Sequence, residues 1–426
     1  MKLIIVGGGF GGLRLARRLS NKKGISITLI DQFNHHQFQP LFYQVATAGL
    51  NASDISFPLR KVFHKSSNIN FRMATVQSIH EMDKKVITDI GEFEYDRLII
   101  ATGAGTNFFG NAEIEKYAIP MKSSIESLHL KERLLCNFEH ALTSPDEATR
   151  QRHLNIIIVG GGPTGVELSG AIADMRHYVL PKDYPEIDFK KMNIYLLEGS
   201  PRLLAAMSEK SSASAQRYLE KLGVIVKTNA LLKTYDGHTA FLANNELIES
   251  ALCIWAAGIK GNIPAGIDAS LIARGNRIKV DRFCKIQGSE NMYAIGDIAF
   301  METTAYPNGH PQLASVAIQQ ADLLATNFLK EVKAKNGKKE FFYNDKGSMA
   351  TVGRNLAVVD IPKPKIHLGG FFAWFIWMSL HLMLILGVKN KFFVFMNWLY
   401  SYFTHDQNLR LIFRNHENQG SPVPRG

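Results

Sequence analysis

An α/β fold with an apolar C-terminal region is predicted by three stretches of the 426-residue sequence. The first is residues 1–12, MKLIIVGGGFGG, where a short apolar run enters a glycine-rich turn and a helical pattern follows. The second is residues 155–167, NIIIVGGGPTGVE, which repeats this arrangement. The third is residues 369–388, GGFFAWFIWMSLHLMLILGV, where only Ser379 and His381 are clearly polar. A strand followed at once by a helix is typical of doubly wound α/β domains, so we expect two of them.

The first glycine-rich turn has the spacing of a dinucleotide-binding motif. Gly7, Gly9 and Gly12 form G-x-G-x-x-G between a strand and a helix. The first glycine allows the tight turn, the second admits a pyrophosphate, and the third lets the helix pack closely on the strand. A second apolar run, residues 26–30, ends at Asp31, 19 residues beyond Gly12, where a carboxylate binds ribose hydroxyls. A glycine-rich surface turn is the alternative, but it would not need this acid.

The second motif predicts a second site of the same kind. Gly160, Gly162 and Gly165 again form G-x-G-x-x-G, and Glu198 ends the next apolar run. The gap of 33 residues between Gly165 and Glu198 exceeds the usual twenty or so, which indicates an insertion. Two such motifs predict two Rossmann-like domains that hold two cofactors, and electron transfer between them. One of the two is usually a flavin.

Later strand-like runs set the expected domain boundaries. Residues 291–295 end at Gly296 and Asp297, and we expect this strand to return the chain to the first domain. We therefore predict one dinucleotide-binding domain from residues 1–117 with 264–330, and a second from residues 118–263. Residues 331–426 form the predicted membrane-associating region.

The C-terminal region is predicted to contain two helices, at about residues 369–388 and 391–404. The second is amphipathic, because Asn397, Tyr400, Ser401 and Thr404 share one helical stripe. We expect the pair to lie in the headgroup region of a membrane, with Trp374, Trp377 and Trp398 as anchors and with flanking lysines, Lys389 and Lys391 among them. A single transmembrane span is the second interpretation, because twenty residues suffice to cross a bilayer. An interface between two copies, and hence a homodimer, is the third.

The composition of the chain indicates which kinds of binding partner to expect. The net charge of +11 suits either nucleic acid or an anionic membrane. Lysine- and arginine-rich clusters interleaved with aromatic residues are absent from the first two-thirds, so we expect an anionic membrane surface and no nucleic acid. Cys136, Cys253 and Cys284 lie far apart without metal-binding spacing, and we expect buried thiols in a reducing compartment and no metal. A first strand that begins at Lys2 leaves no room for a signal peptide, so we expect the protein to stay on the cytoplasmic side or to lose no leader. With the C-terminal helices, this predicts a peripheral position on the cytoplasmic side of the cell membrane.

Several stretches together resemble one family, the type II NADH:quinone oxidoreductases, which are single-chain FAD enzymes that pump no protons. The stretches are VGGGFGGLRLARRL, QPLFYQVATAGL, YDRLIIATGA, VGGGPTGVELSGA, AAGI, YAIGD and GGFFAWFIWMSLHL with NWLYSYFT. The resemblance implies FAD on the first domain and NADH on the second. It also implies a respiratory-chain quinone that enters through a tunnel from the C-terminal helices. No motif places a histidine or cysteine for a covalent link, so we expect the FAD to be bound non-covalently.

The resemblance also implies roles for individual residues. The residues implied for FAD are Gly7, Gly9, Phe10, Gly11, Gly12, Asp31, Thr47, Ala101, Gly103 and Asp297. Those implied for NADH are Gly160, Gly162, Thr164, Gly165, Glu198 and Gly258. Glu167 matches a family glutamate near the flavin with a suspected role in proton delivery; alternatively it is a first-turn acid favoured by the helix dipole. Gln319 matches a family glutamine, whereas Ser315 stands where the family usually has another glutamine near the quinone ring.

Two other functions share part of these features. A flavoprotein reductase with a soluble acceptor, similar to ferredoxin reductases, would have both glycine motifs but would not need the aromatic C-terminal segment. A membrane-docked redox-sensing flavoprotein would keep FAD and could dispense with NADH. Disulfide reductases and sulfide oxidisers are disfavoured, because residues 41–48, LFYQVATA, contain no cysteine where a redox dithiol would lie.

Overall fold

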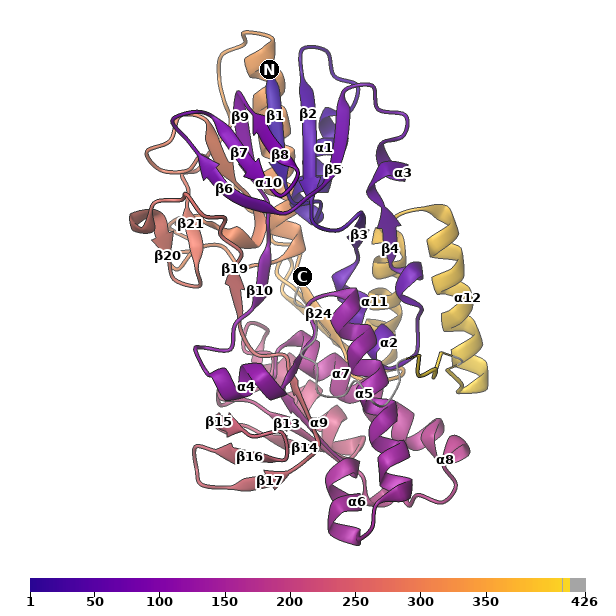
Figure 1. Ribbon diagram of the computed structural model, residues 1–426. Coiled ribbons are helices and arrows are strands. Elements are labelled where there is room, and N and C mark those ends of the chain that lie inside the picture. The colour runs from indigo at the N-terminus through magenta and orange to yellow at the C-terminus, as the bar shows by residue number, and fades with distance from the viewer. Residues whose placement is uncertain (408, 414–426) are drawn as a thin grey trace.

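Two five-stranded parallel sheets, in which all but one outer strand follow the same order, form the body of the protein (Figure 1). The computed structural model describes residues 1–407 and 409–413. The first sheet has the order β22-β9-β1-β2-β5 and consists of β1 (Lys2–Val6), β2 (Ser26–Asp31), β5 (Ile69–Met73), β9 (Arg97–Ile100) and β22 (Met292–Ala294). The second has the order β11-β18-β12-β13-β14 and consists of β11 (Ile119–Pro120), β12 (Asn155–Val159), β13 (Asn193–Leu197), β14 (Val224–Lys227) and β18 (Leu252–Trp255). The predicted α/β fold class is confirmed.

The central strand of each sheet runs directly into the helix that its glycine motif predicts. All five residues of β12 are buried, as expected for a strand covered on both faces. Helix α1 (Phe10–Leu19) follows β1, and helix α7 (Pro163–Tyr178) follows β12 with a proline in its first turn. Helix α10 (Ala314–Val332) packs along α1, where Arg14 donates two hydrogen bonds of 2.8 and 3.0 Å to Asp322.

Smaller elements connect and cover the two sheets. Strands β10 (Ala104–Thr106) and β19 (Ile259–Gly261) pair antiparallel, so the two segments that join the domains run side by side. The other small sheets are β3 (His35–Gln37) with β4 (Ser56–Pro58), β6 (Val76–His80) with β7 (Lys85–Thr88) and β8 (Gly91–Glu94), β15 (Leu232–Tyr235) with β16 (Thr239–Leu242) and β17 (Leu247–Glu249), and β20 (Ile272–Ala273) with β21 (Arg277–Lys279) and β23 (Ala299–Phe300). The remaining helices of the two domains include α2 (Phe42–Ala46), α3 (Leu59–Phe63), α4 (Ala112–Tyr117), α5 (Ser124–Thr143), α6 (Glu147–Leu154), α8 (Leu180–Asp183) and α9 (Glu209–Lys221).

The C-terminal region is a three-stranded antiparallel sheet followed by two helices. Its elements are β24 (Ser348–Thr351), β25 (Ala357–Ile361), β26 (Ile366–Gly369), α11 (Phe371–Leu384) and α12 (Val388–Thr404). The turn after β24 touches the backbone of α7, because a Cβ on Gly170 would lie 2.4 Å from the amide nitrogen of Gly353. Trp377, Ile385 and Val394 join one hydrophobic core with residues of both preceding domains. The region is therefore packed into the body.

Helix α11 corrects the prediction of a twenty-residue helix at residues 369–388. It has 14 residues and ends at Leu384, because residues 385–387 turn the chain into α12. Within residues 1–407 and 409–413, no helix is both long enough and apolar enough to cross a membrane.

Candidate active site

The two glycine turns are built alike at atomic detail. Gly7 and Gly160 have φ values of +106° and +111°, which side-chain-bearing residues rarely adopt. A Cβ on Gly7 would lie 2.2 Å from the carbonyl oxygen of Ala101, and a Cβ on Gly12 or Gly165 would lie 1.9 Å from a carbonyl oxygen of its own turn. Only glycine fits these positions, as the sequence predicted.

The second glycine of each motif faces open space. A Cβ on Gly9 or Gly162 would meet no heavy atom within 4 Å. Both residues are the N-caps of their helices, and neither helix has a side-chain cap. The free N–H groups of these first helical turns therefore face a space suited to a pyrophosphate. Phe10, Gly11 and Thr164 lie in the same first turns.

A carboxylate closes each turn from the next strand. Asp31, at the end of β2, accepts hydrogen bonds from the N–H groups of Gly8 at 2.5 Å and Phe33 at 2.7 Å. Glu198, just after β13, accepts in the same way from Gly161 at 2.6 Å and Ser200 at 2.7 Å. Each carboxylate oxygen keeps a lone pair for a ribose hydroxyl, so both sites fit a dinucleotide.

The other predicted residues of the first site lie at the carboxyl edge of its sheet. Ala101 and Gly103 follow β9, and Asp297 follows β22 in the short 3-10 helix Gly296–Ile298. Asp297 is largely buried, and this burial raises its pKa. Its loop is held by Gln320, whose side-chain oxygen accepts from the Gly296 N–H at 2.7 Å. Gly258 follows β18 at the same edge of the second sheet, with φ of +76°.

Glu167 is a buried acid in the middle of the molecule. It is the fifth residue of α7 and is only 8% exposed, so the interpretation as a first-turn acid is wrong. The Thr351 N–H donates to its Oε1 at 3.3 Å, and the Trp377 indole also donates to this carboxyl. Burial outweighs these two bonds and raises the pKa of Glu167 to about 8, so the acid keeps its proton at neutral pH.

A pocket lies next to Glu167, between α2, α7 and the C-terminal region. Thr47, at the end of α2, lines it together with Tyr43 and Thr351. The Tyr43 hydroxyl is 3.1 Å from the Thr351 hydroxyl and accepts from Gln44 at 2.9 Å. The wall opposite α7 contains Trp374, Met378, Trp398 and Tyr402. The pocket thus joins the predicted flavin side, marked by Thr47, to the C-terminal helices.

Three residues of this site were missed by the sequence analysis. Tyr43 lies in the quoted stretch QPLFYQVATAGL but received no role. Thr351 lies in the predicted C-terminal region and likewise received no role. Trp377 was predicted to anchor the protein in a membrane, and that prediction is wrong: it is 1% exposed, stacks on the His381 ring at 3.8 Å and reaches Glu167.

Gln319 and Ser315 are engaged elsewhere on α10. The Gln319 side chain exchanges two hydrogen bonds with the Asn344 backbone, of 3.0 and 2.9 Å. Ser315 lies 2.9 Å from the Tyr343 hydroxyl. Among the described residues, neither lines the pocket that contains Thr47. The structure thus does not bring Gln319 to Glu167, and its catalytic role stays a prediction.

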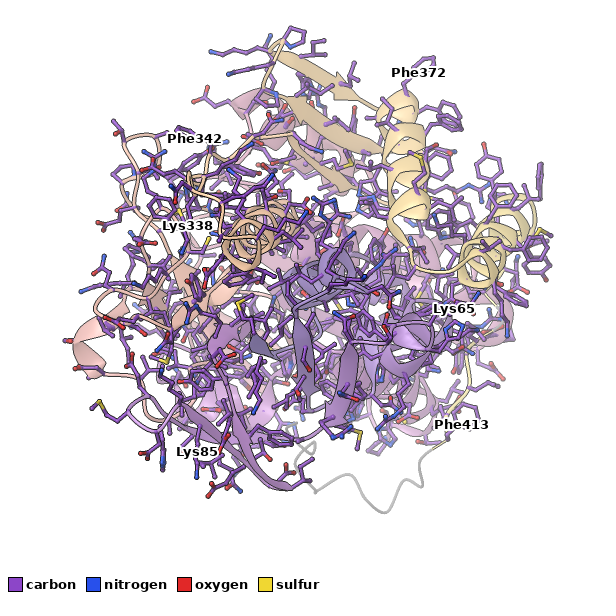
Figure 2. All side chains as sticks on the ribbon, turned by 90° about the horizontal axis from the view of Figure 1, so that it is seen from above. Lys65, Lys85, Lys338, Phe342, Phe372 and Phe413 are labelled. Carbon is purple, nitrogen blue, oxygen red and sulfur yellow. The ribbon has the colours of Figure 1, made fainter. Side chains whose placement is uncertain are left out.

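The outward faces of α11 and α12 are largely apolar, and two asparagines of α12 face the body. The Asn390 side chain donates to the carbonyl groups of Ser53, Asp54 and Ser56, and Asn397 donates to the Asp54 carboxylate. Figure 2 shows Phe372 projecting outward from α11. The large exposed apolar side chains of these helices are Phe371, Phe372, Phe375, Ile376, Met383, Leu384, Val388, Phe392, Phe393, Phe395, Met396, Leu399, Tyr400 and Phe403. We call this set the aromatic face.

Comparisons with known proteins agree with this geometry. Residues 1–321 match the model of the pyridine nucleotide-disulphide oxidoreductase family, and residues 346–405 match that of the NDH2 C-terminal domain. The chain is 35% identical over 415 residues to the type II NADH:quinone oxidoreductase Ndh of Mycobacterium tuberculosis, with 93% of this chain and 87% of that one covered. It is 28% identical over 415 residues to the type II NADH:quinone oxidoreductase of Haemophilus influenzae, with 89% and 92% covered.

Solved structures share the fold. The NDH2 of Plasmodium falciparum in complex with NADH has a TM-score of 0.85 at 22% identity, with 97% of this chain and 99% of that one covered. The sulfide:quinone oxidoreductase of Aquifex aeolicus has a TM-score of 0.72 at 19% identity, with full coverage of both. The chain belongs to the pyridine nucleotide-disulphide oxidoreductase family and, within it, to the type II NADH:quinone oxidoreductases.

Proposed function

We propose that this NADH:quinone oxidoreductase uses non-covalent FAD to pass two electrons from NADH to a membrane quinone, without pumping protons, in a respiratory chain. The observation that carries the proposal is the pocket beside Glu167, which connects the flavin side of the molecule to the C-terminal helices. Two-electron transfer between NADH and a quinone is the chemistry that FAD supplies when bound. The chain supplies binding, orientation and protons.

The first domain is the proposed FAD site. Gly9 offers the open first helical turn to the pyrophosphate, and Asp31 offers its carboxylate to the ribose. All three cysteines are buried, and burial raises the pKa of Cys253 and Cys284, so none is placed to form a covalent flavin link. Acid precipitation should therefore release FAD into the supernatant. Yellow colour that stays with the pellet would contradict non-covalent binding.

We expect NADH to be strongly preferred over NADPH. Glu198 would accept from the ribose 2′-hydroxyl and would repel a 2′-phosphate. Arg202, the nearby cation that could offset this repulsion, donates instead to the carbonyl groups of Met207 at 2.9 Å and Ala205 at 2.8 Å. Comparing kcat/KM for the two cofactors should give a ratio of about a hundred or more, since an unpaired charge costs several kcal/mol. Equal values would refute the assignment of Glu198.

Glu167 is the proposed proton donor to the quinone. It holds a proton at neutral pH because of its burial, and it lies behind the pocket wall that contains Thr351, whose N–H donates to it. The Tyr43 and Thr351 hydroxyls form a polar patch on that wall. A quinone carbonyl oriented toward this patch would receive protons from the protein, while the aromatic residues of the opposite wall exclude bulk water.

The aromatic face is the proposed membrane-binding surface, with the protein peripheral on the cytoplasmic side. A continuous apolar surface on a helix pair suits the headgroup region. Basic side chains lie around it: Lys389 lies over the Phe393 ring at 5.5 Å, and Lys61 lies over the Phe57 ring at 5.6 Å. Lys391 donates to the Met383 carbonyl and so ties α12 to α11. Basic groups next to an apolar face favour an anionic lipid surface.

The test is NADH oxidation by purified protein in detergent, with and without a short-chain quinone. We expect oxidation to depend on the quinone and to produce quinol in equal amount. Ferredoxin-like acceptors should give no comparable rate. NADH oxidation that proceeds with a soluble protein acceptor but not with any quinone would instead support the soluble reductase.

A further inference from the structure

Quinone reduction consumes a proton that must reach a buried site. In the balanced reaction, NADH, quinone and one proton give NAD⁺ and quinol, so the hydride brings one hydrogen nucleus and solution supplies the other. Glu167 can give a proton, but it is buried and must then be recharged. The route of recharging is set by the protein groups around the pocket.

Asp174 is the second acid on the same face of α7. It follows Glu167 by seven residues, two helical turns or about 10 Å along the axis. It lines the same pocket as Tyr43 and Thr351. Its carboxylate packs against Gly353, where a Cβ would lie 3.0 Å from Oδ2, and the Arg354 N–H donates to it.

The surroundings of Asp174 let it exchange a proton near neutral pH. The Arg354 guanidinium faces it across the pocket but is held by the Ser401 and Tyr402 carbonyls. The Arg354 N–H and guanidinium favour the charged form of Asp174, but burial outweighs them and raises its pKa to about 7. The other titratable groups facing it are the Tyr43 hydroxyl on α2 and, at the pocket margin, Tyr178 and His405.

The groups between the two acids are hydroxyls. Tyr43 lies within electrostatic reach of both Glu167 and Asp174, and both acids raise its pKa. Its hydroxyl is 3.1 Å from that of Thr351, whose N–H is bonded to Glu167. Tyr178 is 45% exposed and its ring lies tilted against the His405 ring, 4.9 Å between centroids, so the far side of Asp174 leads to the surface.

We propose that Asp174 relays protons from solution to Glu167, through pocket water and the hydroxyls of Tyr43 and Thr351. The proposal rests on quinone reduction as the function of this pocket. Asp174 does not touch the quinone; it takes a proton at the pocket margin and passes it inward, so the net transfer is one proton from solution to the Glu167 carboxyl. It is a positioning residue for the second proton of the reaction.

The test is Asp174→Asn in the full-length flavin-loaded protein, with a short-chain quinone in detergent. At pH 8 we expect quinone reduction to fall at least about tenfold, because slow recharging of Glu167, the general acid, would then limit the rate. At pH 6 the deficit should shrink, because proton supply from solution rises. Ferricyanide reduction should keep its wild-type rate, because that acceptor takes electrons without protons. Small weak acids such as formic acid should restore part of the lost rate, and Asp174→Glu should retain most of it.

Controls separate this proposal from a structural effect and from failure of the proposed function. Glu186→Gln changes an exposed acid outside the pocket and should have the wild-type pH profile. If the wild type reduces quinone and Asp174→Asn matches it at pH 8, the relay is refuted while the function stands; if the wild type reduces no quinone, the function fails first. Parallel loss of ferricyanide activity without rescue would also refute the relay. If Asp174→Asn fails to bind flavin, Asp174→Ser is tested in its place. Independently of the variants, a pH profile of quinone reduction by the wild-type protein that shows only one ionisation would overturn the proposal.

Discussion

Glu167→Gln is expected to lower quinone reduction about a hundredfold or more while NADH oxidation with ferricyanide survives. The amide keeps the shape of the side chain and can still accept from the Thr351 N–H and the Trp377 indole. It cannot donate a carboxylic proton, and such a donor contributes about 10²- to 10⁴-fold to a rate. In the wild type, quinone reduction should fall above about pH 8, where Glu167 loses its proton. Steady-state rates with both acceptors between pH 6 and 9 measure this.

The same variant gives an independent check through stability. Folding raises the pKa of Glu167 from its ordinary value of 4.5 to about 8, so the folded state binds a proton that the unfolded state has released. The free energy of unfolding therefore decreases as pH rises from 4.5 to 8, by about 1.4 kcal/mol for each pH unit. Glu167→Gln lacks this dependence, so its Tm should gain on the wild type as pH rises. A constant Tm difference across pH 5 to 8 would mean that Glu167 is not buried as an acid.

Replacing Phe392, Phe395 and Phe403 with glutamate is expected to release the protein from membranes. The three side chains are 58%, 47% and 73% exposed on the aromatic face, so the fold should tolerate the change. Burying one such side chain in an apolar medium is worth about 1.5–3 kcal/mol, and losing three should weaken membrane binding at least about a hundredfold. Reduction of a long-chain quinone in vesicles should fall with binding, because that quinone stays in the bilayer. Vesicle flotation and rates with both quinone lengths measure the effect.

Two controls limit the interpretation of this result. Phe342→Glu changes a side chain that is 75% exposed on a different side of the molecule and should leave membrane binding unchanged (Figure 2). Short-chain quinone reduction by the triple variant should remain at the wild-type rate. If the triple variant left the vesicles and still reduced long-chain quinone at full rate, access through the membrane would not be the role of the aromatic face. Deleting the chain from residue 369 onward would be a poorer test, because it also removes Trp377, Ile385 and Val394 from the core.

The two nucleotide sites could be predicted from the sequence because their constraints are local. The backbone of the first glycine turn admits no Cβ at Gly12, where it would meet the Gly7 carbonyl oxygen, and the acid that closes the turn ends the very next strand. These requirements act within about thirty residues of chain. They therefore leave a spacing that can be read without knowing the rest of the fold.

The buried and outward faces of α11 could not be told apart from the sequence. Helix α11 carries apolar residues around its whole circumference, so periodicity cannot tell the face buried on the protein from the face turned outward. Trp377 and Phe372 look alike in the sequence, yet one covers Glu167 and the other points outward. What separates them is the position of α7, which lies more than two hundred residues earlier in the chain. Similarly, nothing near Gln319 in sequence indicates its bonds to Asn344.

The C-terminal region completes a hydrophobic core that it shares with both preceding domains, and it is synthesised after them. A growing chain folds from its N-terminus as it leaves the ribosome, and both nucleotide-binding sheets precede β24 in the chain, so they can assemble first. At that stage Glu167 would still face water, because the residues that cover it, Thr351 and Trp377, are synthesised afterwards. A nascent chain could then hold its nucleotides while its carboxyl remained an ordinary acid. Competence to reduce quinone would arise only with the segment that carries the proposed membrane-binding surface, so on that proposal activity would begin when the protein reaches the membrane.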